Sequence, residues 1–210
     1  MSAQPHDTQQ LFAPGKLFVF GEWSVLEGSP ALIGSTPAGQ QGLLSARSDE
    51  AEPTFVFHSP AFCAQPRRWR WQEGRWCEQA PGEQVGAIDV VGCVLEVAAE
   101  RLVPPKGQQT LEVSARGLFA DKGRKYGVGS SGAIAALVAM ALGQGAEPQR
   151  VLDVALEGHR QAQSGRGSGA DVATSVLAGL SGQPAQILFE LPDPPGLGAA
   201  PADSRHPVAR

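Results

Sequence analysis

The sequence has few cysteines, no long apolar run and no excess of basic residues, and each absence disfavours a class of protein. Its three cysteines, Cys63, Cys77 and Cys93, lack the spacing of a zinc site, so we expect reduced thiols rather than disulfides. The formal net charge of −4 disfavours a nucleic-acid or membrane-surface partner, because both require a basic field. The longest apolar run, 133–142, is too short to span a bilayer, and residues 1–10 lack the apolar run of a signal peptide. We therefore expect a cytoplasmic protein.

Glycine and proline are abundant instead, with 26 and 17 residues, and such a composition predicts many turns. Between the turns, apolar residues recur at the spacing of strands or helices. The pattern predicts short strands at 17–20, 54–58, 110–114 and 186–190, a hairpin over 68–76 with its turn at Glu73-Gly74, and helices over 88–102, 131–142, 149–163 and after Asp171. Periodicity alone therefore indicates a mixed α/β protein.

Arginine and tryptophan alternate along the hairpin over 68–76. Such alternation can bind nucleic acid by stacking. It is also typical of a two-faced strand, in which the tryptophans pack inward while the arginines face water. The acidic charge of the chain favours the two-faced strand.

A chain of 210 residues can form one large domain, or one and a fraction, with a core big enough to fold alone. Residues 1–11 are polar, and we expect them to form a flexible N-terminus. Residues 191–210 are rich in proline without a periodic pattern, so we expect a disordered tail there.

The most informative segment is Lys125-Tyr126-Gly127-Val128-Gly129-Ser130-Ser131-Gly132-Ala133, which leads directly into the apolar run. Closely spaced glycines let several backbone N–H groups point into one concavity, which favours an anion. Ser130 or Ser131 is predicted to cap the following helix, whose N-terminus adds a positive dipole end. These features with the neighbouring Lys125 predict a phosphate site.

The same loop fits the dinucleotide-binding pattern through Gly127, Gly129 and Gly132. That pattern requires an apolar strand before the loop, whereas residues 121–125 are highly polar. Its acidic partner would be Asp153, which falls in a predicted amphipathic helix rather than at a strand end. We therefore disfavour a dinucleotide site, and the sequence holds no Walker A loop.

Three segments together resemble the signatures of the GHMP kinase superfamily, named after galactokinase, homoserine kinase, mevalonate kinase and phosphomevalonate kinase. They are 13–28, which reads APGKLFVFGEWSVLEG, the loop 125–133, and 165–173, which reads GRGSGADVA. They occur in the order of that family and cover most of 12–180. The resemblance implies that 12–190 is the N-terminal ATP-binding domain of such a kinase, a two-layer α+β (α/β) fold of the ribosomal protein S5 domain 2-like type.

Within the superfamily, the resemblance is to the branch that transfers a phosphoryl group from ATP to phosphomevalonate, in isoprenoid precursor synthesis. Lys125-Tyr126, Gly132 and the string Gly-Ser-Gly-x-Asp-Val-Ala carry it. A phosphorylated acceptor beside ATP needs extra positive charge. Basic residues accordingly lie in or beside the motifs: Lys16, Lys122, Arg124, Lys125, Arg160 and Arg166. They are also readable as ordinary surface charge. By the same resemblance, Trp23 stands where mevalonate kinases have histidine and phosphomevalonate kinases often have tyrosine, which makes mevalonate itself a less favoured acceptor.

The resemblance also implies roles for single residues. The ATP phosphates would contact Lys125, Gly127, Val128, Gly129, Ser130, Ser131 and Gly132. The hydroxyl of Ser131, or of Ser130, would face Mg²⁺. Asp171 would orient or deprotonate the acceptor oxygen, and Lys16 would stabilise the developing charge. The acceptor would contact Glu22, Arg166, Gly167, Ser168 and Gly169.

Each of these roles has a structural alternative. Asp171 could be only the N-cap of the helix that follows it. Glu22 could form a structural ion pair. A histidine on a helix, such as His159, is more often packed or solvated than catalytic.

One signature of the superfamily is missing, since the third glycine-rich motif belongs to a C-terminal domain and residues 1–210 contain no match. We consider a fragment, one half of a two-chain enzyme, or a domain that binds without catalysis. A homodimer or a second chain could complete the site, and an exposed apolar patch is expected if a domain is missing. The alternative function is therefore a non-catalytic nucleotide-binding or interaction domain, or a mevalonate kinase-like enzyme.

Overall fold

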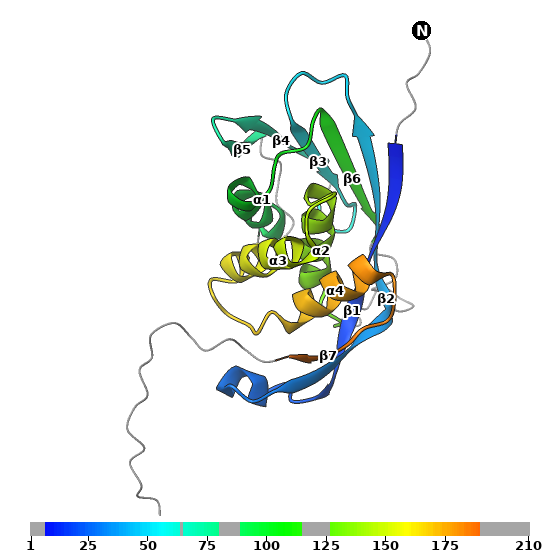
Figure 1. Cartoon of the computed structure of the whole chain (residues 1–210), viewed down its shortest axis with the longest axis vertical. Coiled ribbons are helices and arrows are strands. Elements are labelled where there is room, and N and C mark those ends of the chain that lie inside the picture. The colour runs from blue at the N-terminus through cyan, green and yellow to red at the C-terminus, as the bar shows by residue number, and fades with distance from the viewer. Residues whose placement is uncertain (1–6, 64, 80–88, 115–126, 190–210) are drawn as a thin grey trace, which may run out of the picture.

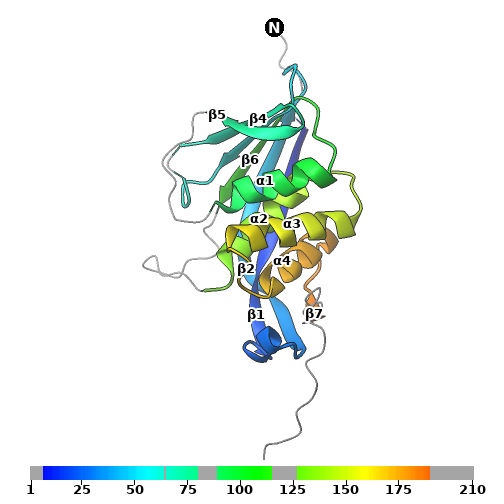
Figure 2. The same cartoon turned by 90° about the vertical axis from the view of Figure 1, so that its left-hand side faces the viewer.

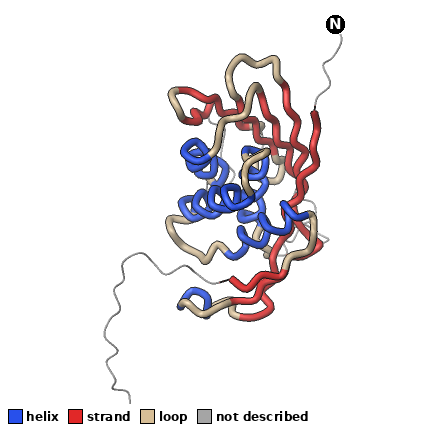
Figure 3. The backbone as a smooth tube through the Cα atoms, viewed as in Figure 1, coloured by secondary structure: helices blue, strands red, loops and turns tan. Residues whose placement is uncertain are grey.

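The computed structural model describes residues 7–63, 65–79, 89–114 and 127–189, and these form a mixed sheet with helices packed on one face (Figures 1 and 3). The strands are β1 (Asp7–Phe20), β2 (Ala31–Arg47), β3 (Thr54–His58), β4 (Arg67–Gln72), β5 (Arg75–Gln79), β6 (Gln108–Ser114) and β7 (Gln186–Phe189). The helices are α1 (Val90–Arg101), α2 (Ser130–Leu142), α3 (Pro148–Ala162) and α4 (Ala170–Ser181), with a 3₁₀ turn, η1, at Ser24–Glu27. The predicted two-layer α/β fold is confirmed.

The strand order is β1-β2-β6-β3-β4-β5, and β7 pairs with the first part of β2. Among the described strands, β3 and β6 pair in parallel and all other neighbours are antiparallel. Figure 2 shows the four helices in front of the sheet, with α2 between α1 and α4. This arrangement brings the N-termini of α2 and α4 close to β1.

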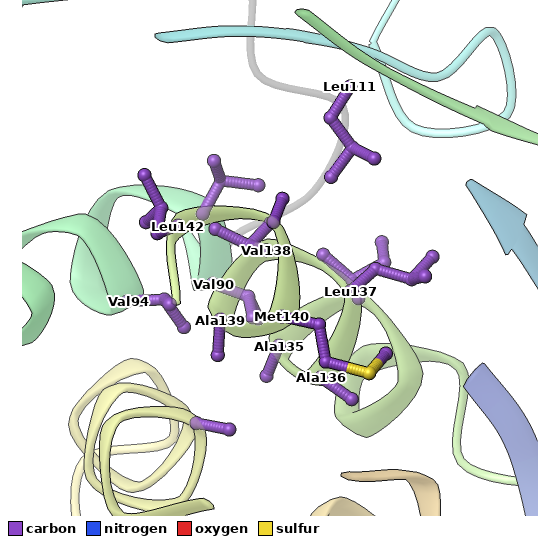
Figure 4. Close-up of a cluster of buried hydrophobic side chains, with 14 of the residues drawn as sticks. Val90, Val94, Leu111, Ala135, Ala136, Leu137, Val138, Ala139, Met140 and Leu142 are labelled. Carbon is purple, nitrogen blue, oxygen red and sulfur yellow. The ribbon is translucent and has the colours of Figure 1, made fainter. Parts of the chain in front are cut away.

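Helix α2 is the centre of the core, and all its residues from Gly132 to Leu142 are buried. It packs against the other three helices and against β1 and β2. Figure 4 shows side chains of α2 on all sides of the helix, with Leu111 of β6 pointing toward it from the sheet. Each fully buried leucine or valine contributes roughly 1.5–3 kcal/mol. The burial of α2 therefore fixes the helix whose N-terminus carries the glycine-rich loop.

A second, smaller core joins the β1-β2-β7 end of the sheet to α4. It consists of Val25, Ala31, Ile33 and Ala170, with Phe18, Ile187 and Phe189 packed against them. Because Ala170 is the first residue of α4, this cluster places the helix start beside β1.

The hairpin is confirmed as a two-faced structure. Trp69 and Trp76 are buried and lie against Phe55, with ring centroids 6.5 Å apart in each pair. The turn falls at Glu73-Gly74, where both residues have positive φ. The tryptophans are therefore part of the core, as expected for the inward face.

The sequence predicted β1 too short and did not predict β2. Residues 7–11 were expected to be flexible but form the start of β1, and β2 was not predicted at all. β2 contains Gly34, Pro37, Gly39 and Gly42, which locally resemble turn signals and interrupt its alternation. Long-range pairing with β1 and β6 forms this strand, and that information is not local. The tail at 191–210 lies outside the described residues.

Candidate active site

The loop before α2 lies directly against β1. The backbone N–H of Lys16 donates to the carbonyl of Val128 over 2.9 Å. A Cβ at Gly15 would lie 2.7 Å from Val128 Cγ2 and 2.9 Å from Thr36 Oγ1, so glycine is needed for this close approach. The register of β1 with β2 shifts between Pro14 and Lys16, which is where the strand meets the loop.

The loop has the backbone form expected of an anion site. Gly127 and Gly129 have φ of +73° and +85°, a conformation that glycine adopts without strain. Gly129 is the N-cap of α2. The first N–H groups of a helix have no partner inside the helix, and they lie at the positive end of its dipole. The loop therefore ends on a helix terminus suited to a phosphate.

The prediction that Ser130 or Ser131 caps α2 was wrong. Gly129 holds the N-cap position and no side chain caps the helix, because both serines already lie inside its first turn. The hydroxyl of Ser131 instead lies 3.1 Å from Nε2 of His159.

Asp171 reaches the same loop from α4. A Cβ at Gly132 would lie 2.7 Å from Asp171 Oδ2, and one at Gly129 would lie 3.0 Å from Asp171 Cβ. The glycines therefore leave the space in which the carboxylate lies. The alternative of Asp171 as an N-cap was wrong, because Gly169 is the N-cap and Asp171 follows in the first turn. Its Oδ1 accepts a hydrogen bond from the N–H of Val172 over 3.0 Å.

Lys16 borders the loop from the side of β1. Its Cγ lies 3.5 Å from the position of a Cβ at Gly129, so Lys16 and Asp171 adjoin the same glycine. The ammonium lies 4.1 Å from the ring centre of Phe18 and 3.8 Å from Glu22 Oε1. Glu22 is largely exposed, and such pairs contribute little to stability. Glu22 is thus placed beside Lys16, in a weak ion pair.

Hydrogen bonds from two further side chains, Gln40 and Ser175, join the elements of the site, and neither residue was predicted to do so. Gln40 is fully buried, and its Nε2 donates to the carbonyl of Ser130 over 2.7 Å. Ser175 Oγ donates to the carbonyl of Pro14 over 2.6 Å, which joins α4 to β1 beside Lys16. A polar residue in a glycine-rich strand, or a serine on an apolar helix, gives no sequence signal for such a role.

His159 is buried and contacts two polar side chains. It is 2% exposed, and its Nε2 lies 3.2 Å from Gln163 Nε2 in addition to the contact with Ser131. Burial lowers the pKa of His159, and the nearby carboxylate of Asp171 opposes this only in part. His159 and Gln163 are four residues apart in the predicted helix, and this spacing is the sequence signal from which their contact could have been predicted.

The second glycine-rich segment, 165–169, lies between α3 and α4. Gly165, Gly167 and Gly169 all have positive φ, and Ser168 Oγ accepts from the N–H of Ala170 over 3.3 Å. Arg166 is exposed. With residues of α1 and α3 this segment borders a cavity of about 460 Å³, whose lining includes Arg166, Gly167, Ser168, Gly169, Arg101, His159 and Arg160. The predicted acceptor residues therefore line one cavity, except Glu22.

Lys125, predicted to contact phosphate, lies outside the described residues, as do Lys122 and Arg124. In the part of the chain that the structure describes, no three His, Cys, Asp or Glu side chains gather as metal ligands. Mg²⁺ commonly takes one or two protein oxygens, with phosphates and water supplying the others. Asp171 and Ser131 offer such oxygens beside the loop, so these residues fit a magnesium nucleotide.

No helix of the described residues is both long and apolar enough to cross a membrane.

The fold is that of the GHMP kinases. Among solved structures, Lactococcus lactis galactokinase with galactose matches with a TM-score of 0.61 at 14% identity, over 89% of this chain and 48% of that one. Streptococcus pneumoniae phosphomevalonate kinase, in complex with phosphomevalonate and AMPPNP, matches with a TM-score of 0.52 at 18% identity, over 81% and 47%. Methanococcus jannaschii mevalonate kinase matches with a TM-score of 0.54 at 13% identity, over 84% and 52%. No protein-family model matches the chain.

The sequence comparison confirms the resemblance to one branch. The phosphomevalonate kinase of Streptomyces sp. strain CL190 is 33% identical over 200 residues, which are 86% of this chain. The match covers 49% of that enzyme, so the chain spans about half the length of its curated relative. This similarity supports a role as a kinase.

Proposed function

We propose that this chain is the nucleotide-binding half of an enzyme that transfers the γ-phosphoryl group of ATP to phosphomevalonate, giving diphosphomevalonate. The observation that carries the proposal is the meeting of Lys16 and Asp171 at Gly129, where the N-terminus of α2 begins. The similarity to the Streptomyces phosphomevalonate kinase supports this acceptor. A cytoplasmic location is part of the proposal.

The chemistry needs little covalent participation by the protein. A phosphoryl transition state spreads negative charge over the transferred group, so catalysis consists mainly of positioning and cationic stabilisation. The N–H groups at the start of α2 hold phosphate oxygens, and the ammonium of Lys16 neutralises the charge that develops beside them. Magnesium, when bound with the nucleotide, supplies further positive charge.

Asp171 acts on the acceptor. Its carboxylate lies against the start of α2, at the glycine that Lys16 also adjoins. An acceptor hydroxyl there could donate its proton to this carboxylate. An acceptor that is already a phosphate is ionised at neutral pH, so Asp171 serves it more as an orienting group than as a base. The cavity beside 165–169 is lined by three arginines, Arg101, Arg160 and Arg166, and by two acidic residues, Asp153 and Glu157, of which Glu157 pairs with Arg160. Arg166 is the exposed cation on the glycine-rich segment that could meet a phosphorylated acceptor.

An assay of ADP release tests the proposal, with phosphomevalonate, mevalonate or no acceptor. We expect turnover with phosphomevalonate, a loss of about 10²–10⁴-fold in Asp171→Asn and a loss of about 10²–10³-fold in Lys16→Met. Matched controls are Asp49→Asn and Lys106→Met, which alter charges outside the site. Equal ADP release without any acceptor would contradict the transfer to phosphomevalonate.

A second candidate is a domain that binds a nucleotide without catalysis. The match to only 49% of the Streptomyces enzyme favours it, because the remainder of that enzyme has no aligned counterpart in residues 1–210. ATP binding by calorimetry without turnover, unchanged in Asp171→Asn, would support this candidate. Turnover that appears only when a second chain is added would instead support a two-chain enzyme.

A further inference from the structure

Gln40 of β2 is a fully buried polar side chain that bonds the first residue of α2. Its amide nitrogen, Nε2, lies 2.7 Å from the carbonyl oxygen of Ser130. A backbone carbonyl can only accept a hydrogen bond, so the nitrogen and not the oxygen of the amide faces Ser130. The remaining amide atom, Oε1, is buried and has no hydrogen-bond partner among the residues that the structure describes.

The stability of the fold does not explain this glutamine. In an α-helix each carbonyl accepts from the N–H four residues later, so the carbonyl of Ser130 already has a partner within α2. The bond from Gln40 is therefore additional to the bonds of the helix. A buried acceptor without a partner costs free energy, and an apolar side chain of similar length has no such cost. An amide at position 40 needs a different reason.

The bond from Gln40 acts on the peptide unit between Ser130 and Ser131. This unit is planar, with the carbonyl of Ser130 on one side and the N–H of Ser131 on the other. Ser131 lies in the first turn of α2, where the N–H groups have no partner within the helix and lie at the positive end of its dipole. A hydrogen bond to the carbonyl polarises the unit, which makes its N–H a stronger donor. Gln40 therefore influences an anion-binding N–H through a single peptide unit.

Gln40 is also fixed relative to the other parts of the candidate site. It pairs with Ala13 in the ladder of β1 and β2. The next residue of β1, Pro14, accepts a hydrogen bond from Ser175 of α4, and the N–H of Lys16 donates to the loop before α2. This short part of the ladder therefore holds the amide, the loop and α4 in one arrangement.

We infer that Gln40 is a positioning residue for the nucleotide, which fixes the peptide unit between Ser130 and Ser131 and strengthens the N–H of Ser131 as a donor to a phosphate oxygen. The inference rests on the proposed function, because it assumes that ATP binds at the start of α2. Gln40 is too deeply buried to contact ATP itself, so it acts through the backbone. Its removal should therefore weaken nucleotide binding without weakening the fold.

The test is the substitution Gln40→Met in the whole chain, which removes the donor and keeps a side chain of similar length. Gln109→Met is the matched control, because Gln109 is a buried glutamine on β6 whose Oε1 also lacks a partner within the described ranges. Calorimetry measures the affinity for ATP with magnesium, and thermal unfolding measures stability. We expect Gln40→Met to weaken ATP binding by about three- to tenfold, the scale of one hydrogen bond, with an unfolding midpoint no lower than that of the native chain. Gln109→Met should leave the affinity unchanged.

Two results of this comparison would overturn the inference. One is an ATP affinity that is unchanged in Gln40→Met, or reduced equally in Gln109→Met. The other is a clear loss of stability in Gln40→Met that Gln109→Met does not share, because the amide would then serve the fold. A chain that no longer folds with Gln40→Met counts as this second result.

NMR of the native chain supplies a test without any substitution. Polarisation through a peptide unit is mutual, so a phosphate bound to the N–H of Ser131 should strengthen the bond between Gln40 and Ser130. On saturation with ATP, the signal of the bonded side-chain N–H of Gln40 should therefore move downfield, while the side-chain signals of Gln109 stay in place. An unmoved Gln40 signal in a chain that binds ATP would overturn this inference and leave the proposed function intact. If the native chain binds no ATP, the proposed function fails, and this inference fails with it.

Discussion

Gly132 shows how one missing side chain can shape the site. It lies in the first turn of α2, and a Cβ there would approach Asp171 Oδ2 to 2.7 Å and Cγ to 2.8 Å. The clash is with the end of a side chain rather than with backbone. A larger residue at 132 would therefore displace the carboxylate without preventing the helix from forming.

We predict that Gly132→Ala lowers turnover by about a hundredfold while the protein stays folded. A displacement of about 1 Å at a reacting group can cost this much in rate. Alanine also has the higher helix propensity, by roughly 1 kcal/mol, which offsets the strain of the clash. The measurements are steady-state kinetics and thermal unfolding. Gly34→Ala is the control, because nothing lies within 4 Å of a Cβ at that position. Full activity of Gly132→Ala would show that the carboxylate does not need its present place.

At the scale of elements, a partly buried ion-pair network joins the hairpin to α1, with Arg67 buried and its two acidic partners half-buried. The guanidinium of Arg67 on β4 bonds both carboxylate oxygens of Glu78 on β5, at 2.7 and 2.9 Å. It also bonds both oxygens of Asp89, the N-cap of α1, at 2.7 and 2.9 Å. The same guanidinium stacks on Trp69 at 4.5 Å from the ring centre. One side chain thus joins two strands and a helix.

We predict that Arg67→Met destabilises the protein by about 2 kcal/mol, because it leaves two half-buried carboxylates without their partner, and their partial exposure to water keeps the loss below that of a fully buried pair. Denaturant unfolding measures the change. Arg75→Met is the control, since Arg75 is exposed on the same hairpin. Equal effects of the two substitutions would show that the network contributes no more than a surface charge.

Acid should weaken the same network. Burial by itself raises the pKa of Asp89, but hydrogen bonds from Arg67 and from the N–H of Gly92 outweigh it and lower the pKa from its usual 3.8. A carboxyl with a lowered pKa binds fewer protons in the folded protein than in the unfolded one. Its contribution to stability is therefore complete above its ordinary pKa and is lost as the pH falls below that value.

The expected measurement is the free energy of unfolding from neutral pH to about pH 3. The native protein should lose more stability over this range than Arg67→Met, in which Asp89 has lost its partner. Glu157, whose pKa is also lowered, is present in both proteins and cancels in the comparison. Parallel curves for the two proteins would contradict the role given to Asp89.

The bounds of some helices and strands could be predicted from the sequence, and those of others could not. α1, α2, α3 and β3 were predicted to within about two residues, and α4 was predicted from its start alone, because each has a periodic apolar pattern. The strand β2 was missed, since its glycines and its proline have the local signature of turns and only pairing with its neighbours makes it a strand. Local pattern and long-range pairing disagree there.

The sequence motifs predicted which segments form the site, but not all the side-chain contacts that hold it together. The segments with Lys16, Gly129 and Asp171 were recognised from their order along the chain, and the structure brings these residues together. Gln40 and the partner of His159 were not predicted. Their roles depend on which buried groups meet across elements, and a single sequence contains no record of that.

At the scale of the whole molecule, one end of the sheet carries an exposed apolar face. Phe20 of β1, Leu32 of β2 and Leu188 of β7 lie opposite one another, so their side chains point to the same side. Phe20 and Leu188 are 72% and 69% exposed, and Trp23, nearby in the chain, is 79% exposed. Figure 1 shows this end of β1, β2 and β7 at the bottom of the molecule, beyond the helices. A patch of this kind is the one expected of a chain that matches half of a longer relative.

We predict that the 210-residue chain self-associates through this face, and that the double substitution Phe20→Ser and Leu188→Ser makes it more monomeric. Apolar area removed from water contributes roughly 25 cal/mol per Å², so polar replacements here cost the associated state and not the core. Sedimentation velocity over a range of concentrations measures the effect, with circular dichroism as the check on folding. Val103→Ser is the control, because Val103 is 87% exposed but lies in the connection between α1 and β6. If the native chain sediments as a monomer at all concentrations, or if Val103→Ser shifts it as much, then this face does not drive association.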